Sequence, residues 1–246
     1  AYRTAVSLKK NNVPIAGIVD LRNDPDGELV DQVRSEGITI YPGHAIVSTA
    51  GYLRVKSVKI MQLSENGTEL IGSMKEVRCD SVGMSGGWNP TVHLFSQSGG
   101  KLKWDEELAQ FLPKTATQNL VSIGGCDGTQ GLRNCLKAGL KAGAESANAT
   151  NNKGRAPRLP KIIEPKYNDQ RTIWLIPTER ANEKISKHFV DFQNDVTASD
   201  IGLAAREGYR SVEHLKRYTT MGMGTDQGKT SNVAALAILA ETLGTT

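Results

Sequence analysis

The sequence predicts an α/β fold with an antiparallel meander, followed by a small α-helical module. Three observations support this prediction. Helix and strand periodicities alternate over the first 86 residues, and glycine-rich stretches follow two later apolar runs. The last 60 residues then contain three helix patterns separated by glycines. A chain of 246 residues is long enough to bury a core without the help of disulfides.

The composition excludes several classes of protein. The 30 Lys and Arg residues are spread among 26 Asp and Glu residues, without the basic cluster typical of nucleic-acid binding. No run approaches the roughly 18 apolar residues of a membrane span. Three cysteines are too few for a disulfide framework, which favours the cytoplasm. The four histidines lack metal-ligand spacing, so we expect no metal site, and no arrangement of side chains predicts a catalytic residue.

The chain begins with the pattern of a dinucleotide-binding βαβ unit. Residues 1–11 have helical periodicity, and the apolar run 15–20 predicts a buried parallel strand that ends in Asp20. In such a unit, an acidic residue at the strand end binds a ribose hydroxyl, so Asp20 is a candidate cofactor residue. A simple strand-capping role for Asp20 is equally compatible with the pattern. Because the glycine fingerprint that should precede the helix is missing, we expect an internal piece of a longer polypeptide.

The next elements follow in a regular order. Residues 27–36 predict a helix that ends at Gly37, and a strand is expected next. Alternating apolar and polar residues predict an antiparallel meander over 45–48, 53–63 and 68–71. Two further runs, 77–87 and 120–125, are predicted to be buried strands with glycine-rich exits. A helix with small residues at every third or fourth position is expected over 132–149.

This order resembles the back half of the two-dinucleotide-domain fold of the pyridine nucleotide–disulfide oxidoreductases, with partial Rossmann-type domains. SGGWNP at 85–90 matches the crossing between their two domains, and GGCDGTQGL at 124–132 corresponds to a second return. Glycines let a backbone approach a pyrophosphate, and a helix N-terminus favours negative charge. A tight turn that packs a helix on a strand is the alternative. The resemblance implies contacts to the cofactor NAD from Gly124, Gly125, Thr129, Gln130 and Leu132.

The C-terminal part has the clearest helix signals. After a proline-rich linker, a short strand is predicted at 173–176 and a strand-like run at 189–195. Thr197 and Asp200 predict a capping box for a helix that ends near residue 207, and Ser211 caps the next helix. A glycine-rich loop, GMGTDQG, precedes the last helix at 232–243.

This arrangement resembles the small iron–sulfur module of bacterioferritin-associated ferredoxins. The four cysteine positions of that module correspond here to Asp191, Gln193, Asp226 and Ser231. Thiolates hold such clusters, so we expect the skeleton of the module without an iron–sulfur cluster. The predicted domains are 1–86, part of an inserted NAD-type Rossmann domain with the meander; 87–165, the return to the first dinucleotide domain and the linker; and 166–246, the helical module.

The cysteine-free module, KHFVDFQNDVTASDIG and onward, is similar to the middle of heterotetrameric sarcosine oxidase alpha subunits, and AYRTAV and IVDLRNDPDG agree. The resemblance implies a flavin-dependent oxidative demethylation of sarcosine to glycine, with the one-carbon unit passed to tetrahydrofolate. It implies NAD on the alpha subunit, FMN at the interface with the beta subunit, and gamma and delta subunits as further partners. The amine site would lie on the beta subunit, so this piece alone should be inactive.

One group of residues beside the glycine-rich loop suggests a phosphate site. Cations, hydroxyls and a helix N-terminus together suit a phosphate. We therefore expect this loop to face the FMN phosphate, and a solvated charged helix end is the alternative. Two other functions stay open: an iron–sulfur electron carrier of a related amino-acid or opine dehydrogenase, and a scaffold without chemistry. The group consists of Lys216, Arg217, Thr219, Thr220, Lys229 and Thr230.

Overall fold

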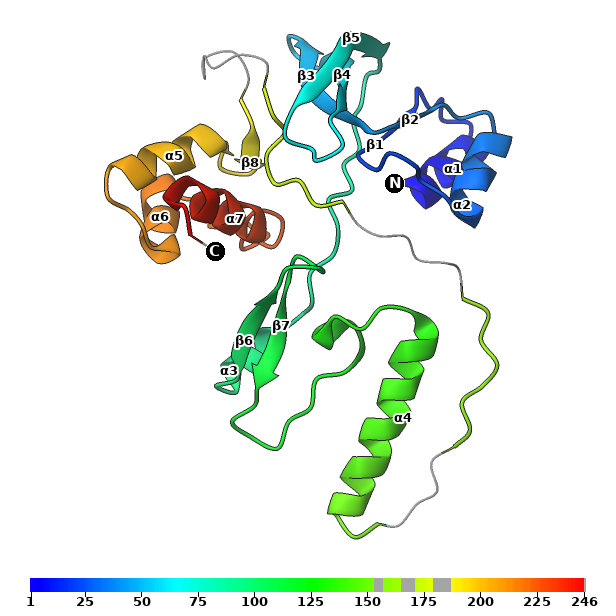
Figure 1. Ribbon diagram of the computed structural model, residues 1–246, viewed down its shortest axis with the longest axis vertical. Coiled ribbons are helices and arrows are strands. Elements are labelled where there is room, and N and C mark those ends of the chain that lie inside the picture. The colour runs from blue at the N-terminus through cyan, green and yellow to red at the C-terminus, as the bar shows by residue number, and fades with distance from the viewer. Residues whose placement is uncertain (153–156, 165–170, 179–186, 246) are drawn as a thin grey trace. The chain divides into compact units, whose positions relative to one another are not determined.

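The computed structural model describes residues 1–152, 157–164, 171–178 and 187–245 (Figure 1). The chain divides into two compact units whose segments alternate along the sequence. Unit 1 contains residues 1–15, 25–38 and 83–170, and unit 2 contains residues 16–24, 39–82 and 171–246.

Two short helices pair at the start of unit 1. Helix α1 (Tyr2–Lys10) and helix α2 (Glu28–Ser35) contact each other through apolar faces that bury Val6 and Val33. Gly37 follows α2 with a φ of +68°, a conformation that glycine adopts without steric cost. Both helices confirm the periodicity of the sequence.

Unit 2 contains the strand that ends in Asp20. Strand β1 (Ile18–Asp20) runs parallel to β2 (Ile40–Pro42), with Ile18 opposite Ile40. The predicted parallel strand is therefore confirmed, although it is shorter than expected. In the described chain these two strands form a two-stranded sheet of their own.

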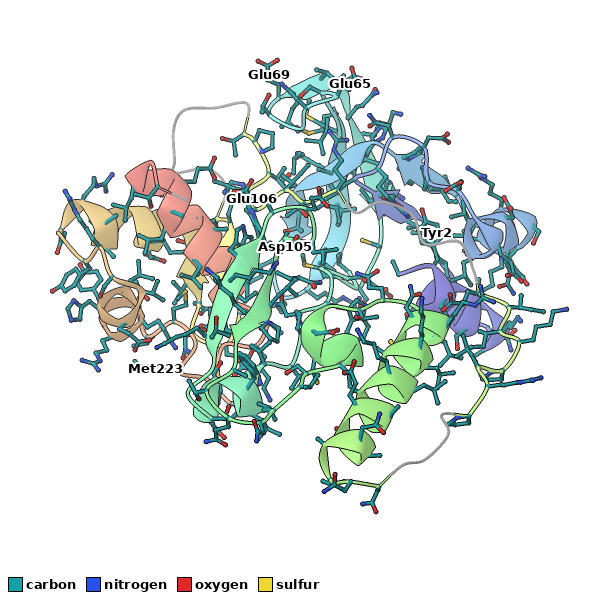
Figure 2. The ribbon with its side chains drawn as sticks, turned by 60° about the horizontal axis from the view of Figure 1, so that its bottom comes forward. Tyr2, Glu65, Glu69, Asp105, Glu106 and Met223 are labelled. Carbon is teal, nitrogen blue, oxygen red and sulfur yellow. The ribbon has the colours of Figure 1, made fainter. Side chains whose placement is uncertain are left out.

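The predicted meander is also confirmed. Strands β3 (His44–Gly51), β4 (Val55–Leu63) and β5 (Leu70–Arg78) form an antiparallel sheet in the order β3–β4–β5. The central strand, β4, supplies most of the buried apolar side chains, because it has a partner on each edge. Glu65 and Glu69 lie at the turn that connects β4 to β5 (Figure 2).

The two predicted return strands are wrong. Val77 belongs to β5, opposite Val58, and residues 79–92 have no regular structure. Residues 116–123 are likewise irregular and lead into a 3-10 helix, η1 (Gly124–Asp127). An apolar run becomes a strand only beside another strand with free hydrogen-bonding groups. In the described chain, β1 and β2 pair only with each other, and neither returning run pairs with them.

Between these two runs in the sequence, the chain forms elements that the sequence pattern did not predict. They are helix α3 (His93–Gln97) and a hairpin of β6 (Lys101–Asp105) and β7 (Gln110–Thr115). Trp104 and Phe111 face each other across the hairpin, with ring centroids 4.9 Å apart. Helix α4 (Leu132–Ala149) has the predicted bounds but buries none of its residues (Figure 1).

The helical module at the C-terminus has its own core. It comprises β8 (Phe189–Asp191), β9 (Val196–Thr197), α5 (Ala198–Arg206), α6 (Val212–Thr219) and α7 (Asn232–Leu243). Ile201, Leu215 and Met221 are fully buried at its centre, and Trp174 packs against them from the preceding segment. The strand predicted at 173–176 is wrong, because this segment bends at Trp174 instead of pairing with another strand.

Candidate functional site

The return loop before α4 is folded on itself by local hydrogen bonds. Gly124 has a φ of +68°, and its carbonyl accepts a hydrogen bond from the Thr129 N–H at 3.0 Å. The same N–H donates to Asp127 Oδ1, also at 3.0 Å. Gly125 has open space around it, and its backbone is exposed. The predicted residues thus lie in one loop, and an acidic side chain already uses one of its donors.

A carboxylate also occupies the N-terminus of α4. Gly131 precedes the helix with a φ of +87°, and the Arg133 N–H donates to Glu164 Oε1 at 2.7 Å. A helix N-terminus attracts negative charge through its free N–H groups and its dipole. Gln130 and Leu132 are exposed on either side. The N-terminus of α4 has the free donors and positive dipole expected of a phosphate-binding site. In this structure the carboxylate of Glu164 binds there.

Asp20 is bound by a neighbouring arginine. Its Oδ1 accepts the Arg22 backbone N–H at 2.9 Å and Nε at 3.1 Å, and its Oδ2 accepts Nη2 at 2.6 Å. A bidentate arginine of this kind uses most of the acceptor capacity of a carboxylate. The arrangement is the one expected of a residue that caps the end of a strand. A ribose hydroxyl would have to compete with Arg22 for the same oxygens.

The hydroxyls predicted for the phosphate site are engaged within the module. Thr219 Oγ1 donates to the Leu215 carbonyl at 2.8 Å, and Thr220 Oγ1 donates to the Thr219 carbonyl at 2.6 Å. Thr230 Oγ1 donates to Asp226 Oδ2 at 2.5 Å. These three hydroxyls therefore stabilise the local structure of the module through hydrogen bonds.

The cations of this site lie at two places in the module. Lys216 and Arg217 are in the last turn of α6, where positive charge also complements the helix dipole. Lys229 is exposed in the loop that connects α6 to α7, as is Met223 (Figure 2). No described residue forms an ion pair with these three cations, so they are the predicted groups that could bind an anion.

The four positions that correspond to cluster cysteines carry polar side chains, and three of these have hydrogen-bond partners. Asp226 accepts the backbone N–H groups of Gly228 and Thr230 at 3.0 and 3.1 Å. The Thr230 hydroxyl and these N–H groups hold the pKa of Asp226 below its usual value. Asp191 is buried and accepts three backbone N–H groups. Ser231 Oγ is fully buried and has no hydrogen-bond partner among the described residues.

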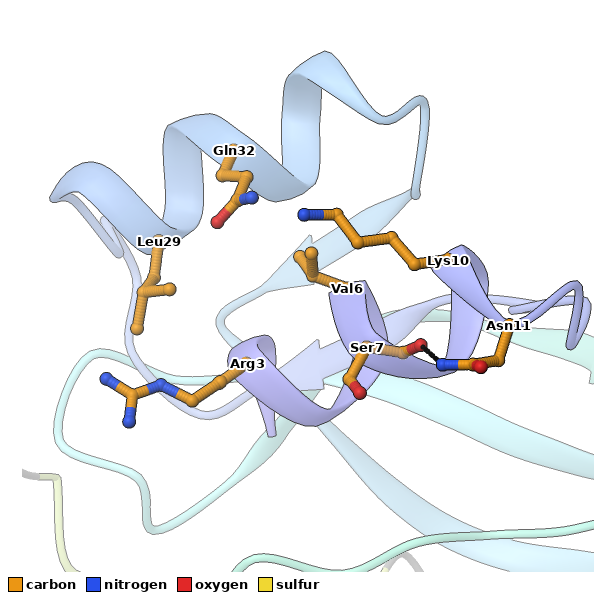
Figure 3. Close-up of a pocket in the computed structure, with 7 residues that line it drawn as sticks. All are labelled: Arg3, Val6, Ser7, Lys10, Asn11, Leu29 and Gln32. Carbon is orange, nitrogen blue, oxygen red and sulfur yellow. Dashed lines mark hydrogen bonds between the residues drawn. The ribbon is translucent and has the colours of Figure 1, made fainter.

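Sequence reasoning missed a groove between α1 and α2 (Figure 3). Its volume is about 360 Å³, and its lining includes Arg3 and Lys10 from the same face of α1 and Leu29 from α2. The seven-residue spacing of the two cations, two helical turns, could have indicated it. A second hollow of about 500 Å³ lies at the turn between β4 and β5. The predicted cofactor residues line neither.

Among the described residues, no three His, Cys, Asp or Glu side chains gather closely enough to hold a metal ion. No helix in these ranges has the length and apolar character that crossing a membrane requires.

The comparisons with known proteins agree along the chain. Residues 185–246 match the model of the sarcosine oxidase A3 domain. The sarcosine oxidase subunit alpha of Rhizobium meliloti (strain 1021) is 40% identical over 99% of this chain and 23% of its own length. Its counterpart from Corynebacterium sp. (strain P-1) is 32% identical over 99% of this chain and 25% of its own length. That from strain U-96 is 31% identical over 94% of this chain and 24% of its own length.

A solved structure shares the fold. The crystal structure of L-proline dehydrogenase from P. horikoshii covers 95% of this chain, and this chain covers 46% of it, with a TM-score of 0.61 at 17% identity. The prediction of an α/β chain with an antiparallel meander and a helical module is thereby confirmed. The chain spans about a quarter of the length of the curated relatives it matches. Over that quarter, it belongs to the family of sarcosine oxidase alpha subunits.

Proposed function

We propose that this chain is part of the alpha subunit of a flavin-dependent sarcosine oxidase, which demethylates sarcosine to glycine and passes the one-carbon unit to tetrahydrofolate. The observation that carries the proposal is the similarity to three sarcosine oxidase alpha subunits over 94–99% of the chain. In this proposal the beta, gamma and delta subunits are its partners in the cytoplasm. The oxidising site lies on another subunit, so the chain contributes binding surfaces and no catalytic residue.

The first contribution we propose is to NAD binding through the return loop. Gly124 and Gly125 would allow the backbone to approach the pyrophosphate, and the N-terminus of α4 would face its negative charge. Glu164 would have to leave the Arg133 N–H first, because both anions need the same donor. Thr129, Gln130 and Leu132 would flank the cofactor, and Asp20 is a weaker candidate because Arg22 binds its carboxylate.

The second contribution we propose is to the FMN phosphate at the interface with the beta subunit. Lys216, Arg217 and Lys229 would supply positive charge, because their side chains are the free groups of the predicted set. The hydroxyls of Thr219, Thr220 and Thr230 would act by shaping the loop. FMN would supply electron transfer when bound, and the lysines would orient its phosphate.

The FMN proposal is tested in the assembled complex by Lys216→Glu and Lys229→Glu, with Lys187→Glu as a control on the same module. Because a phosphate is repelled by a carboxylate at either site, we expect each of the first two variants to lose at least tenfold in FMN content per complex. The control should keep its FMN. Full retention of FMN in both site variants would contradict this part of the proposal.

Titration calorimetry of the complex with NAD tests the other part. Measurable binding that weakens severalfold in Gly125→Val would support the return loop, since the added side chain blocks approach of the backbone. Absence of NAD binding would instead favour a scaffold role. The absence of cysteine at Asp191, Gln193, Asp226 and Ser231 argues against an iron–sulfur carrier.

A further inference from the structure

Three side-chain hydrogen bonds connect the turn after β8 to the loop between α6 and α7. The Gly222 N–H donates to Asp191 Oδ2 at 2.7 Å. Asn194 Nδ2 donates to the Thr220 carbonyl at 3.0 Å. Thr225 Oγ1 donates to Gln193 Oε1 at 2.9 Å. The bonded residues are 26 to 32 positions apart in sequence, so the bonds bring together segments that α5 and α6 separate.

Asp191 is the centre of this arrangement. Its side chain is buried, with the residue only 2% exposed, and besides Gly222 it accepts the N–H groups of Gln193 at 2.9 Å and Asn194 at 3.2 Å. Its described partners are all uncharged. A buried carboxylate is costly unless hydrogen bonds replace its water. Burial raises the pKa of Asp191, but these backbone donors outweigh it and hold the pKa below its usual value.

The loop is shaped to meet these side chains closely. Gly222 has a φ of +69°, and a side chain at Gly224 would collide with Gln193. Met221, next to Gly222, is fully buried in the core of the module. The loop is therefore held both by Met221 in the core and by hydrogen bonds to Asp191, Gln193 and Asn194.

Two of the bonding side chains stand where the iron–sulfur module has cysteine ligands. Asp191 and Gln193 occupy the first pair of these positions, and both bind the loop that carries the second pair. A metal cluster joins the same two segments through its ligands. In this chain, hydrogen bonds connect these two segments instead.

We propose that residues 191–194 form a latch that holds the loop at 220–226 closed in place of a metal cluster, with Asp191 as its positioning residue. An ionised carboxylate accepts from several donors, whereas the amide of asparagine presents one acceptor and one donor. Asp191→Asn therefore keeps the shape of the side chain but turns an N–H₂ toward one of its N–H partners. The latch should then open locally while the core of the module remains packed.

Hydrogen–deuterium exchange on the intact chain tests the latch. We expect exchange at residues 220–226 to be at least tenfold faster in Asp191→Asn, with the amides of α5 and α7 unchanged. The control is Asp195→Asn, which removes the same charge from an exposed site in the same turn and should stay within twofold of wild type. Unchanged protection at 220–226 in Asp191→Asn, or an equal loss over the whole module, would overturn the proposal.

A second arm separates a latch from simple destabilisation. After correction for intrinsic exchange rates, protection of 220–226 in wild type should fall as the pH drops below about 4. This fall should be smaller in Asp191→Asn, where only Asp226 of the two aspartates still titrates. If Asp191→Asn does not fold, Asn194→Ala removes one of the three bonds and should speed exchange severalfold at the same residues. Wild-type protection in Asn194→Ala, or an identical pH profile in Asp191→Asn, would contradict the proposal.

Discussion

At the scale of single residues, the two serines that precede helices α6 and α7 differ in one respect. Ser211 Oγ accepts the His214 N–H at 3.3 Å, whereas Ser231 Oγ is fully buried and finds no hydrogen-bond partner in the part of the chain that the structure describes. A satisfied N-cap stabilises a helix, and a buried unpaired hydroxyl destabilises the fold. The same side chain therefore has opposite effects at two helix ends of one module.

This contrast predicts opposite results for the same substitution. Ser211→Ala should lower the free energy of unfolding by about 1 kcal/mol, because the cap is lost. Ser231→Ala should raise it by about 1 kcal/mol, because an unpaired buried hydroxyl is removed. Urea denaturation of both variants beside wild type measures the difference. A loss of stability in Ser231→Ala would mean that its hydroxyl has a partner, such as a buried water.

At the scale of elements, helix α4 is unusual because none of its 18 residues is buried. Its stability then depends on intrinsic propensity and on its ends, where Glu164 meets the Arg133 N–H. The helix also contains Gly139 and Gly143, which lower helix propensity. A side chain at Gly143 would meet nothing within 4 Å.

Gly143→Ala should therefore stabilise α4 by about 0.5–1 kcal/mol, because alanine has less backbone entropy to lose. Circular dichroism through a thermal melt of the isolated chain should show more helix and later melting. A substitution of the half-buried Ala144 by serine, which has a slightly lower helix propensity, should have the opposite effect. If Gly143→Ala instead weakened assembly with the other subunits, the small residues of α4 would form a contact surface.

The predictable elements are those whose signals are local. The bounds of α4 and α7 agree with the sequence, and the capping box of Thr197 and Asp200 is present as expected. The return strands failed because a strand depends on a partner that periodicity does not reveal. The hairpin of β6 and β7 was missed because its pairing across Trp104 and Phe111 depends on tertiary contact.

At the scale of the whole molecule, two kinds of group give stability the same dependence on pH. Burial lowers the pKa of His188, so the folded chain favours neutral imidazole. Hydrogen bonds also lower the pKa values of Asp191 and Asp226. In both cases the unfolded chain binds the proton more readily, so stability falls as the pH drops.

The unfolding free energy should accordingly decrease in two steps on acidification. The first begins below about pH 6.5 as the unfolded-state histidine takes up its proton, and the second below about pH 4 as the aspartates do. Urea denaturation at a series of pH values measures both steps. His188→Gln should remove the first step and leave the second. A single step at low pH in wild type would contradict the role given to His188.

The local features of the candidate site follow from the sequence, whereas the partners of its side chains do not. Gly124 has a positive φ, Lys216 lies in the last turn of α6, and α4 begins after a glycine, while a role of these residues in cofactor binding stays a prediction. Which donors are free depends on acidic side chains that approach in three dimensions, as Glu164 and Asp226 do. No spacing rule connects Glu164 to Arg133 across 31 positions.

One arginine makes hydrogen bonds that can form only late in the synthesis of the chain. Arg171 donates to the carbonyls of Leu21, Ser64 and Glu65 at 2.6–2.8 Å, and Glu65 lies 106 positions before it. During synthesis at roughly 5–20 residues per second, the turn after β4 leaves the ribosome about 5–20 s before Arg171 does. Until Arg171 has been synthesised, these carbonyls lack their hydrogen-bond donor. In that interval the early strands of unit 2 can pair incorrectly or bind chaperones. Slow translation over the proline-rich linker would lengthen that interval.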